Sequence, residues 1–175
     1  MDISLKIPTT KYARDIEEFR REILEANDKD AFAGCFGLKE CESVADWIKD
    51  VNKWRNAETC PQDHVPADVY IAVRNSDDRI VGVIDLRHHI NNPVLRAWAG
   101  HIGYSVRPSE RGKGYAKEML RQNLLRAKEL GLIQVMISCD HDNHASEKTI
   151  LANGGVLEGE INVDGNVMKK YWILL

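Results

Sequence analysis

Residues Val106–Ala116 read V-R-P-S-E-R-G-K-G-Y-A and join a β-like run to an amphipathic helix. Glycines such as Gly112 and Gly114 adopt backbone conformations closed to other residues and let the chain approach a ligand closely. A helix N-terminus presents unpaired N–H groups and a partial positive charge, to which Arg111 and Lys113 add cationic side chains. The stretch therefore predicts a phosphate or pyrophosphate site. The alternative is a basic turn with a glycine start to the helix.

Two common phosphate motifs fit this stretch poorly. A P-loop needs GxxxxGK followed by Ser or Thr, whereas the order here is Gly112-Lys113-Gly114-Tyr115. A dinucleotide fingerprint needs GxGxxG, but Lys117 stands where the third glycine would be. The strands expected before the motif also form a meander rather than a βαβ unit. Neither class of nucleotide site is favoured.

The periodicity of apolar residues on both sides of the motif predicts the element order. We expect helices over 10–26, 43–56, 116–130 and 143–153, and strands over 4–7, 69–74, 79–86, 99–106, 134–138, 156–163 and 167–174. Asp164-Gly165 is the turn signal of the last hairpin. Helices come first, then a meander, then a β-α-β-α-β-β order, which indicates a mixed α+β fold. A chain of 175 residues without a linker predicts one domain over 1–175.

The charge balance argues against a nucleic-acid or anionic membrane partner. The chain carries 24 Lys and Arg against 27 Asp and Glu, a net charge of −3, whereas proteins built around such polyanions are usually strongly basic. The positive charge is concentrated: residues 107–128 have seven basic and two acidic groups. A phosphate-rich ligand at the motif is consistent with this distribution.

Cysteine usage and the N-terminal residues predict a soluble, cytoplasmic protein. The four cysteines (35, 41, 60 and 139) form no CxxC pair and no zinc spacing, so we expect free thiols in a reducing compartment. Met1–Pro8 lacks the apolar core of a signal peptide, and no window reaches the length of a membrane span. Asp140–His144 resembles a metal site in composition but fits no calcium-loop or zinc pattern, so no metal is expected.

The motif resembles that of the Gcn5-related N-acetyltransferases (GNAT). Arg111–Ala116 matches the R/Q-x-x-G-x-G/A signature of this family, with Val106 and Pro108 before it and Asn143-His-Ala-Ser146 after it. The sequence Asn153-Gly154-Gly155 at the end of the following helix and the predicted element order also agree with this family. The resemblance spans nearly the whole chain. It implies a mostly antiparallel twisted sheet flanked by helices, in which two parallel strands (99–106 and 134–138) splay apart.

Binding of acetyl-coenzyme A is what the resemblance implies for these positions. Backbone N–H groups of Arg111, Gly112, Lys113, Gly114, Tyr115 and Ala116 would hold the pyrophosphate. The strand near Val106 would pair with the pantetheine arm, Asn143 would hydrogen-bond it, and Ser146 lies one turn later. The implied reaction is direct attack on the thioester, in a ternary complex, by a primary amine of a small molecule, amino acid, peptide or protein.

The acid and the base of this reaction are less defined by the resemblance. Many members carry a general-acid tyrosine four residues before the helix-ending glycine, and here that position is Ile150, which cannot donate. Tyr171, Cys139, Ser146 or water would have to serve. His101 is the candidate base, because its ordinary pKa suits proton transfer at neutral pH; the alternative is a surface or packed histidine.

The acceptor is not identified by the sequence, although two groups of residues could line its cleft. The first is Asp85, Arg87, His88 and His89, and the second is Tyr12, Trp47 and Trp54; the alternatives are solvated loop residues and core residues. Family members are often dimers, so a homodimer stays open. Two further readings remain, namely a non-catalytic CoA-binding module, which the missing tyrosine favours, and a generic nucleotide-binding regulatory domain.

Overall fold

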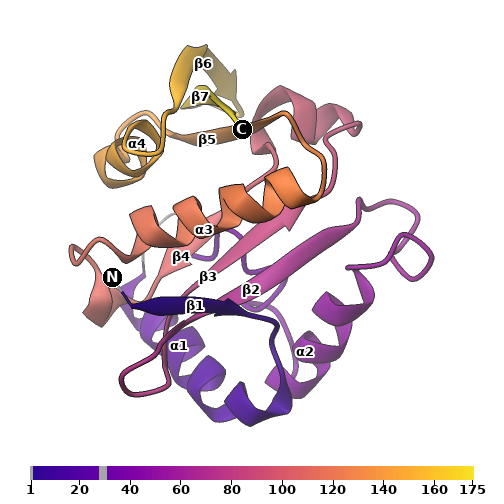
Figure 1. Cartoon of the computed structure of the whole chain (residues 1–175), viewed down its shortest axis with the longest axis vertical. Helices are drawn as coiled ribbons and strands as arrows, with labels where there is room; N and C mark the ends of the chain where they lie inside the picture. The colour runs from indigo at the N-terminus through magenta and orange to yellow at the C-terminus, as the bar shows by residue number, and fades with distance from the viewer. Residues whose placement is uncertain (1, 28–30) are drawn as a thin grey trace.

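Four antiparallel strands form the larger sheet of the computed structural model, which describes residues 2–27 and 31–175. The order is β1-β2-β3-β4, with bounds Ile3–Lys6, Ala67–Arg74, Arg79–Arg87 and Tyr104–Val106. β1 pairs with β2, β2 with β3, and β3 with β4. The predicted hairpin over β2 and β3 is thus confirmed, and it is extended at one edge by the chain's first strand (Figure 1).

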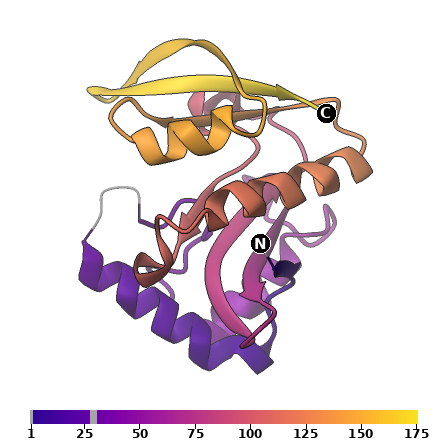
Figure 2. The same cartoon turned by 60° about the vertical axis from the view of Figure 1, so that its left-hand side comes forward.

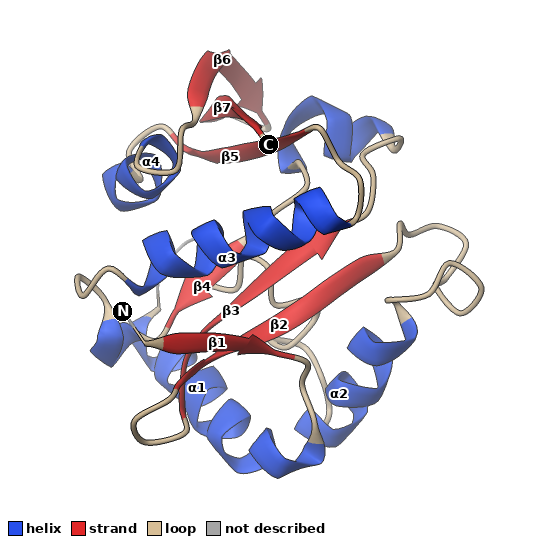
Figure 3. Cartoon of the chain, viewed as in Figure 1, coloured by secondary structure: helices blue, strands red, loops and turns tan. Residues whose placement is uncertain are grey.

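Helices cover both faces of this sheet, because its strands alternate apolar side chains between the faces. α1 (Ala13–Ala26) and α2 (Val44–Lys53) pack on the face that carries Val69, Ile71 and Val73. α3 (Tyr115–Glu129) packs on the opposite face, against Tyr70 and Ala72. Figure 3 shows α1 and α2 on one side of the sheet and α3 on the other.

A second sheet of three antiparallel strands follows in the order β5-β7-β6. β5 is Gln134–Asp140, β6 is Val156–Val163 and β7 is Asn166–Leu174, while α4 spans His144–Leu151 between the first two. The buried side chains of this sheet share one core with α3 and with one face of the larger sheet. α3 thus runs beside both sheets (Figures 1 and 2) and joins them.

The two sheets meet where β4 and β5 begin to separate. The His101 N–H donates to Met136 O at 2.9 Å, and the Met136 N–H donates to the His101 ring. No strand pairing joins β4 to β5 in the described part of the chain. The predicted fold class, mixed α+β with helices flanking antiparallel strands, is confirmed, and β4 and β5 are the pair expected to splay.

Local signals in the sequence explain where several elements begin and end. Ser43 caps α2 by accepting the Asp46 N–H at 3.1 Å, and Asn143 caps α4 in the same way. Asp164 and Gly165 both have positive φ, as a two-residue hairpin turn of this type requires. All three signals act over few residues, and the Asp164-Gly165 turn is the one that the sequence predicted.

The predicted strand over 99–106 is wrong in its first half. The segment Leu95–Ala99 forms a π-helical turn, and the strand begins only at Tyr104. Gly100 has φ +67°, and a Cβ on it would lie 2.4 Å from Met136 O. The backbone there passes too close to β5 for a regular strand, a constraint that strand propensity along the sequence does not contain.

Candidate functional site

β4 has one edge that pairs with β3 and one edge that does not. The Gly103 N–H donates to the Asp85 carboxylate and the Arg107 N–H to Val81 O, so both point toward β3. Because backbone groups alternate along a strand, those of Tyr104 and Val106 point to the other side. No strand among the described residues pairs with that side. The unpaired edge can accept an extended ligand as an additional strand.

The unpaired edge leads directly into the start of α3. A 3-10 turn over Pro108–Glu110 follows β4, and Gly112 and Gly114 then adopt φ values of +73° and +84°. Gly114 is the N-cap of α3, so the first N–H groups of the helix have no partner within it. A Cβ on Gly112 would meet nothing within 4 Å. An anion can therefore approach this backbone, as the motif predicts.

Buried Arg107 holds the first part of this junction against α1. Its Nη1 donates to Asp15 Oδ1 at 2.7 Å and to Ile80 O at 2.7 Å, and its Nε donates to Glu22 Oε1 at 2.9 Å. The side chain of Arg107 has no solvent exposure. A buried guanidinium is stable only when it is paired in this way, so the cluster orders the chain just before the glycines.

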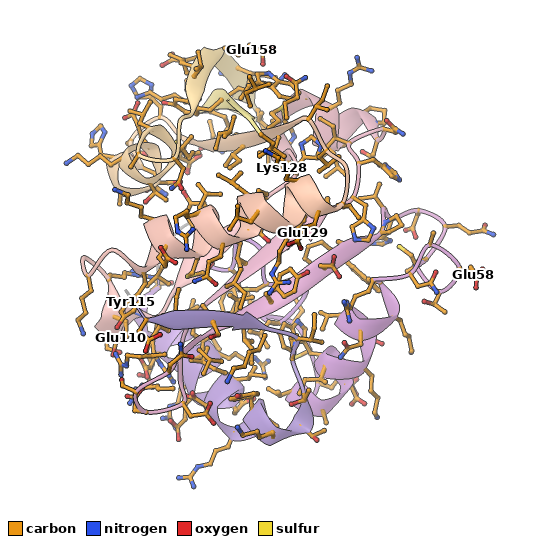
Figure 4. The ribbon with its side chains drawn as sticks, in the orientation of Figure 1. Glu58, Glu110, Tyr115, Lys128, Glu129 and Glu158 are labelled. Carbon is orange, nitrogen blue, oxygen red and sulfur yellow. The ribbon has the colours of Figure 1, made fainter. Side chains whose placement is uncertain are left out.

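A second cluster holds the end of the junction. Arg74 Nη1 donates to Glu110 Oε2 at 3.0 Å and to the Tyr115 hydroxyl at 3.1 Å. Glu110 and Tyr115 lie together at the start of α3 in Figure 4. Lys113 Nζ donates to Glu110 Oε2 at 2.8 Å, so its charge already has a partner within the loop. Tyr115 is buried, so it offers a ligand its backbone N–H rather than its side chain.

Across the gap from β4, α4 begins with the predicted Asn143. Asn143 Oδ1 accepts the Ser146 N–H at 3.0 Å, which makes it a helix cap. Ser146 Oγ lies 2.8 Å from the hydroxyl of Tyr104, so a hydrogen bond links α4 to β4. Burial raises the pKa of Tyr104, which keeps the phenol protonated at neutral pH. Ile150, one turn after Ser146, is fully buried.

The other candidate proton donors are held away from solvent. The Tyr171 hydroxyl donates to Glu147 Oε1 at 2.8 Å, and its side chain is almost fully buried. Burial raises the pKa of the Cys139 thiol to about 11. The thiol therefore stays protonated at neutral pH and is no nucleophile.

His101 lies at the point where the two sheets meet. Its Nδ1 accepts the Met136 N–H at 2.9 Å, and its side chain is 5% exposed. Burial, with Arg87 nearby, lowers the pKa of His101 to about 4. A neutral ring that accepts at Nδ1 carries its hydrogen on Nε2, so neither nitrogen is free to take a proton. The geometry favours the packed-histidine alternative over the base.

A pocket of about 450 Å³ lies beside the beginning of β4. Arg87, at the end of β3, is the member of the predicted cleft group that lines it; Asp85 is fully buried, and His88 pairs with Asp68 at 3.1 Å. His64 also lines the pocket, with Nδ1 2.8 Å from Asp63 Oδ1.

The aromatic residues of the first half divide between core and pocket. Tyr12 and Trp47 are core residues, which is the alternative that the sequence left open for them. Trp54 packs behind the pocket wall. Its ring centroid lies 4.8 Å from that of Phe36 and 4.6 Å from that of His64. The sequence marks neither Phe36 nor His64 as a candidate site residue, and it marks Tyr104 only through the backbone of the strand near Val106, not through its hydroxyl. Nothing local marks these side chains, because each reaches the site only through the packing of a loop or strand.

The described residues contain neither a membrane-spanning helix nor a cluster of metal ligands. No helix among residues 2–27 and 31–175 is long and apolar enough to span a membrane. The same residues contain no group of three or more His, Cys, Asp or Glu side chains that could hold a metal ion. All four cysteines are unpaired thiols, as predicted.

Comparison with known proteins identifies the fold. A family model described as an acetyltransferase (GNAT) domain matches residues 10–156. A ribosomal-protein-S5-alanine acetyltransferase from Vibrio fischeri has a TM-score of 0.72 at 17% identity, covering 99% of this chain and 93% of its own. The microcin C7 self-immunity acetyltransferase MccE, solved with acetyl-CoA and AMP, has a TM-score of 0.70 at 18% identity, with the same coverage.

A third similar solved structure is named for a polyamine substrate. It is a spermidine N-acetyltransferase chimera from Vibrio cholerae and hSSAT, with a TM-score of 0.65 at 16% identity, covering 99% of this chain and 96% of its own. No curated protein is similar enough to count as a relative. Because the family model spans most of the chain and agrees with the motif at 111–116, the chain belongs to the GNAT family of acetyltransferases, enzymes that use acetyl-CoA.

Proposed function

We propose that residues 1–175 form one N-acetyltransferase domain that transfers an acetyl group directly from acetyl-CoA to a primary amine in a ternary complex. The observation that carries this proposal is the unpaired edge of β4 leading into the start of α3. A strand edge suits the amide-containing pantetheine arm, and a helix N-terminus suits the pyrophosphate. Both lie on consecutive residues, in the order in which coenzyme A presents these groups.

The residues present fit coenzyme A. The backbone N–H groups of Gly112, Gly114, Tyr115 and Ala116 would hold the pyrophosphate, and the open space over Gly112 leaves room for it. Arg111 and Lys113 would contribute positive charge, which for Lys113 requires exchanging Glu110 for a phosphate oxygen. When bound, acetyl-CoA supplies the activated acetyl thioester.

Three groups on the walls of the gap extend the binding site. The Val106 backbone would pair with the pantetheine arm, and Asn143 and Ser146 would contact it from α4. The Tyr104 N–H points away from β3, so it can donate to the carbonyl oxygen on which negative charge develops. This backbone donor is already fixed by the pairing of β4 with β3, so it needs little reorganisation during the reaction.

The Tyr104 and Ser146 hydroxyls together form the proton source in this proposal. Their hydrogen bond at 2.8 Å spans the gap between β4 and α4. It places a phenol from the opposite wall near the helix face where Ile150 replaces the usual tyrosine. Burial raises the pKa of Tyr104, which keeps the phenol protonated at neutral pH but also weakens it as an acid. It would therefore stabilise the leaving thiolate by hydrogen bonding as much as by proton transfer.

His64 is the base in this proposal, in place of His101. Its Nδ1 lies 2.8 Å from Asp63 Oδ1, which orients the ring and leaves Nε2 free to accept a proton. His64 lines the same pocket as Gly34, which contacts the beginning of β4 at Gly103. An amine bound in the pocket could therefore pass its proton to His64 directly or through one water.

Two measurements test the function. Acetyl-CoA should raise the melting temperature well beyond any effect of ATP or NAD, and equal or absent shifts contradict the binding site. Release of free CoA thiol with an amine panel then separates the enzyme from the alternative, a non-catalytic acetyl-CoA-binding module. The buried Ile150 at the usual tyrosine position favours that alternative. Binding without thiol release for every amine tested would support it.

A further inference from the structure

The pocket beside β4 is built from four separate segments of the chain. Phe32, Gly34 and Phe36 come from the loop after α1, His64 from the loop before β2, Arg87 from the end of β3, and Leu95 from the turn before β4; these six residues carry the inference. Gly34 forms the wall nearest the reaction: a Cβ on it would lie 2.2 Å from Gly103 O. One end of the pocket therefore abuts the strand that binds the thioester, and the 450 Å³ volume suits a small molecule.

Arg87 presents a fixed cation to this pocket. Its Nη1 donates to Ala99 O at 3.1 Å and to Gly100 O at 3.2 Å, and its side chain is 17% exposed. Its Nη2 lies 3.3 Å from Oδ2 of the fully buried Asp85, an ion pair that holds the guanidinium in place from behind. The planar fork of a guanidinium carries five N–H donors, so a side chain anchored in this way at the pocket wall can still bind a ligand carboxylate.

The rest of the lining is mostly apolar, with one aromatic ring held in an unusual conformation. The Arg87 guanidinium carbon lies 5.4 Å from the centroid of the Phe36 ring, and Phe36 packs edge-on against Trp54. Phe36 has φ +44°, which an aromatic residue adopts only under constraint from its surroundings. The ring and the guanidinium together make a surface for an apolar group with a carboxylate beside it.

The distribution of charge favours a carboxylated amine over a polycation. Asp63 is the one acidic side chain among the lining residues, and it is paired with His64 and largely exposed. A polyamine would have to place some of its positive groups near Arg87, whose own carboxylate partner Asp85 is buried behind it. The lining accordingly favours an amine that carries negative charge.

We propose that the acceptor is an α-amino acid with an apolar or aromatic side chain, whose carboxylate pairs with Arg87 and whose side chain packs on Phe36. The inference rests on the proposed function, because the amine must lie toward Gly34 and β4. The Arg87 N–H donates to His101 O, two residues before Gly103. Arg87 and the start of β4 are therefore neighbours across one strand spacing, which suits an amine and a carboxylate attached to one carbon atom.

The wild-type enzyme tests this without any substitution. CoA thiol release is measured with L-phenylalanine against phenethylamine, with L-leucine against 3-methylbutylamine, and with spermidine. The amino acids should have kcat/KM values about 10- to 100-fold higher than their decarboxylated analogues, the range for one charge-assisted hydrogen bond to a carboxylate. Equal or reversed preference within the pairs, or spermidine as the best acceptor, would overturn the inference.

Variants at Arg87 test whether this residue is the source of the preference. Arg87→Met should remove the preference by lowering kcat/KM for L-phenylalanine about 10- to 100-fold more than that for phenethylamine, and Arg87→Lys should restore part of it. Arg14→Met, a change at a side chain that is 94% exposed on α1, is the matched control and should alter neither. If Arg87→Met lowers both rates equally, Arg87 is only structural and the inference fails.

Product binding separates this inference from the proposed function. Calorimetry of the wild-type protein with N-acetyl-L-phenylalanine and with N-acetylphenethylamine needs no turnover. If no amine releases CoA but the carboxylated product binds at least tenfold more tightly, the function fails and the pocket assignment stands. If thiol is released with other amines while neither product is distinguished, the function stands and the pocket assignment is overturned.

Discussion

The buried ring of His101 makes the stability of the protein depend on pH in a defined window. The pKa of His101 is about 4 in the folded chain, against about 6.5 in an unfolded one. The unfolded chain thus binds the proton more tightly, so stability is full above pH 6.5 and falls as the pH drops toward 4. Linkage with these two pKa values predicts a loss of about 2 kcal/mol between pH 7 and pH 5.

His101→Asn isolates this contribution. The Asn side-chain oxygen can still accept the Met136 N–H, but the side chain does not titrate in this range. Urea unfolding followed by tryptophan fluorescence gives the free energy of unfolding of both proteins at pH 7, 6 and 5. The variant should lack about 2 kcal/mol of the loss that the wild type shows. Carboxylates with a depressed pKa, such as Glu118 and Asp78, contribute stability that is lost only below about pH 4.5. They are present in both proteins, so their contribution cancels in the comparison.

If the free energy of unfolding depends on pH in the same way in both proteins, His101 is not held neutral by burial and the prediction is refuted. The same variant also tests catalysis. If His101 only connects the two sheets, the pH profile of kcat/KM should keep its inflection in His101→Asn. If His101 is the general base, the inflection should disappear and kcat/KM should fall by at least about 100-fold.

Three other substitutions test the site and its support. Gly114→Trp should abolish acetyl-CoA binding in calorimetry, whereas Gly131→Trp, with a similar positive φ at the far end of α3, should retain it; retained binding in the first would contradict the pyrophosphate site. Arg107→Met should lower the free energy of unfolding by about 3 kcal/mol. Arg121→Met, which breaks an exposed ion pair, should lower it by less than about 1 kcal/mol. Equal losses would contradict a stabilising role for the buried Arg107 cluster. His64→Asn should lower kcat/KM by about 100-fold, and an unchanged kcat/KM would exclude it as the base.

The order of the elements was predictable because each one depends on neighbouring residues. The apolar spacing of the helices and the Asp164-Gly165 turn act over a few positions, and the structure confirms them. The Ser43 cap that the structure shows at the start of α2 is equally local. The glycine motif at 111–116 is local in the same sense. It lies at a strand-to-helix junction, where both the motif and the fold require it.

The role of His101 and the extent of its strand were not predictable in this way. The propensities of 99–106 favour a continuous strand, yet Gly100 lies against Met136 O and the strand starts at Tyr104. The exposure and hydrogen bonding of His101 depend on β5, some 35 residues later in the chain. A histidine that looks like a base in sequence is, in the fold, a contact between two sheets.

By itself, the sequence determined the family, the element order and the junction proposed to bind the cofactor, since these follow from local periodicity and one contiguous motif. Only the tertiary structure decided what lines the pocket proposed for the acceptor. Phe36, His64 and Arg87 come from three loops and strand ends separated by more than 20 residues each, and packing alone brings them to one pocket. Local propensity carries no information about such meetings, because their geometry is set by how the sheets and helices fill the core.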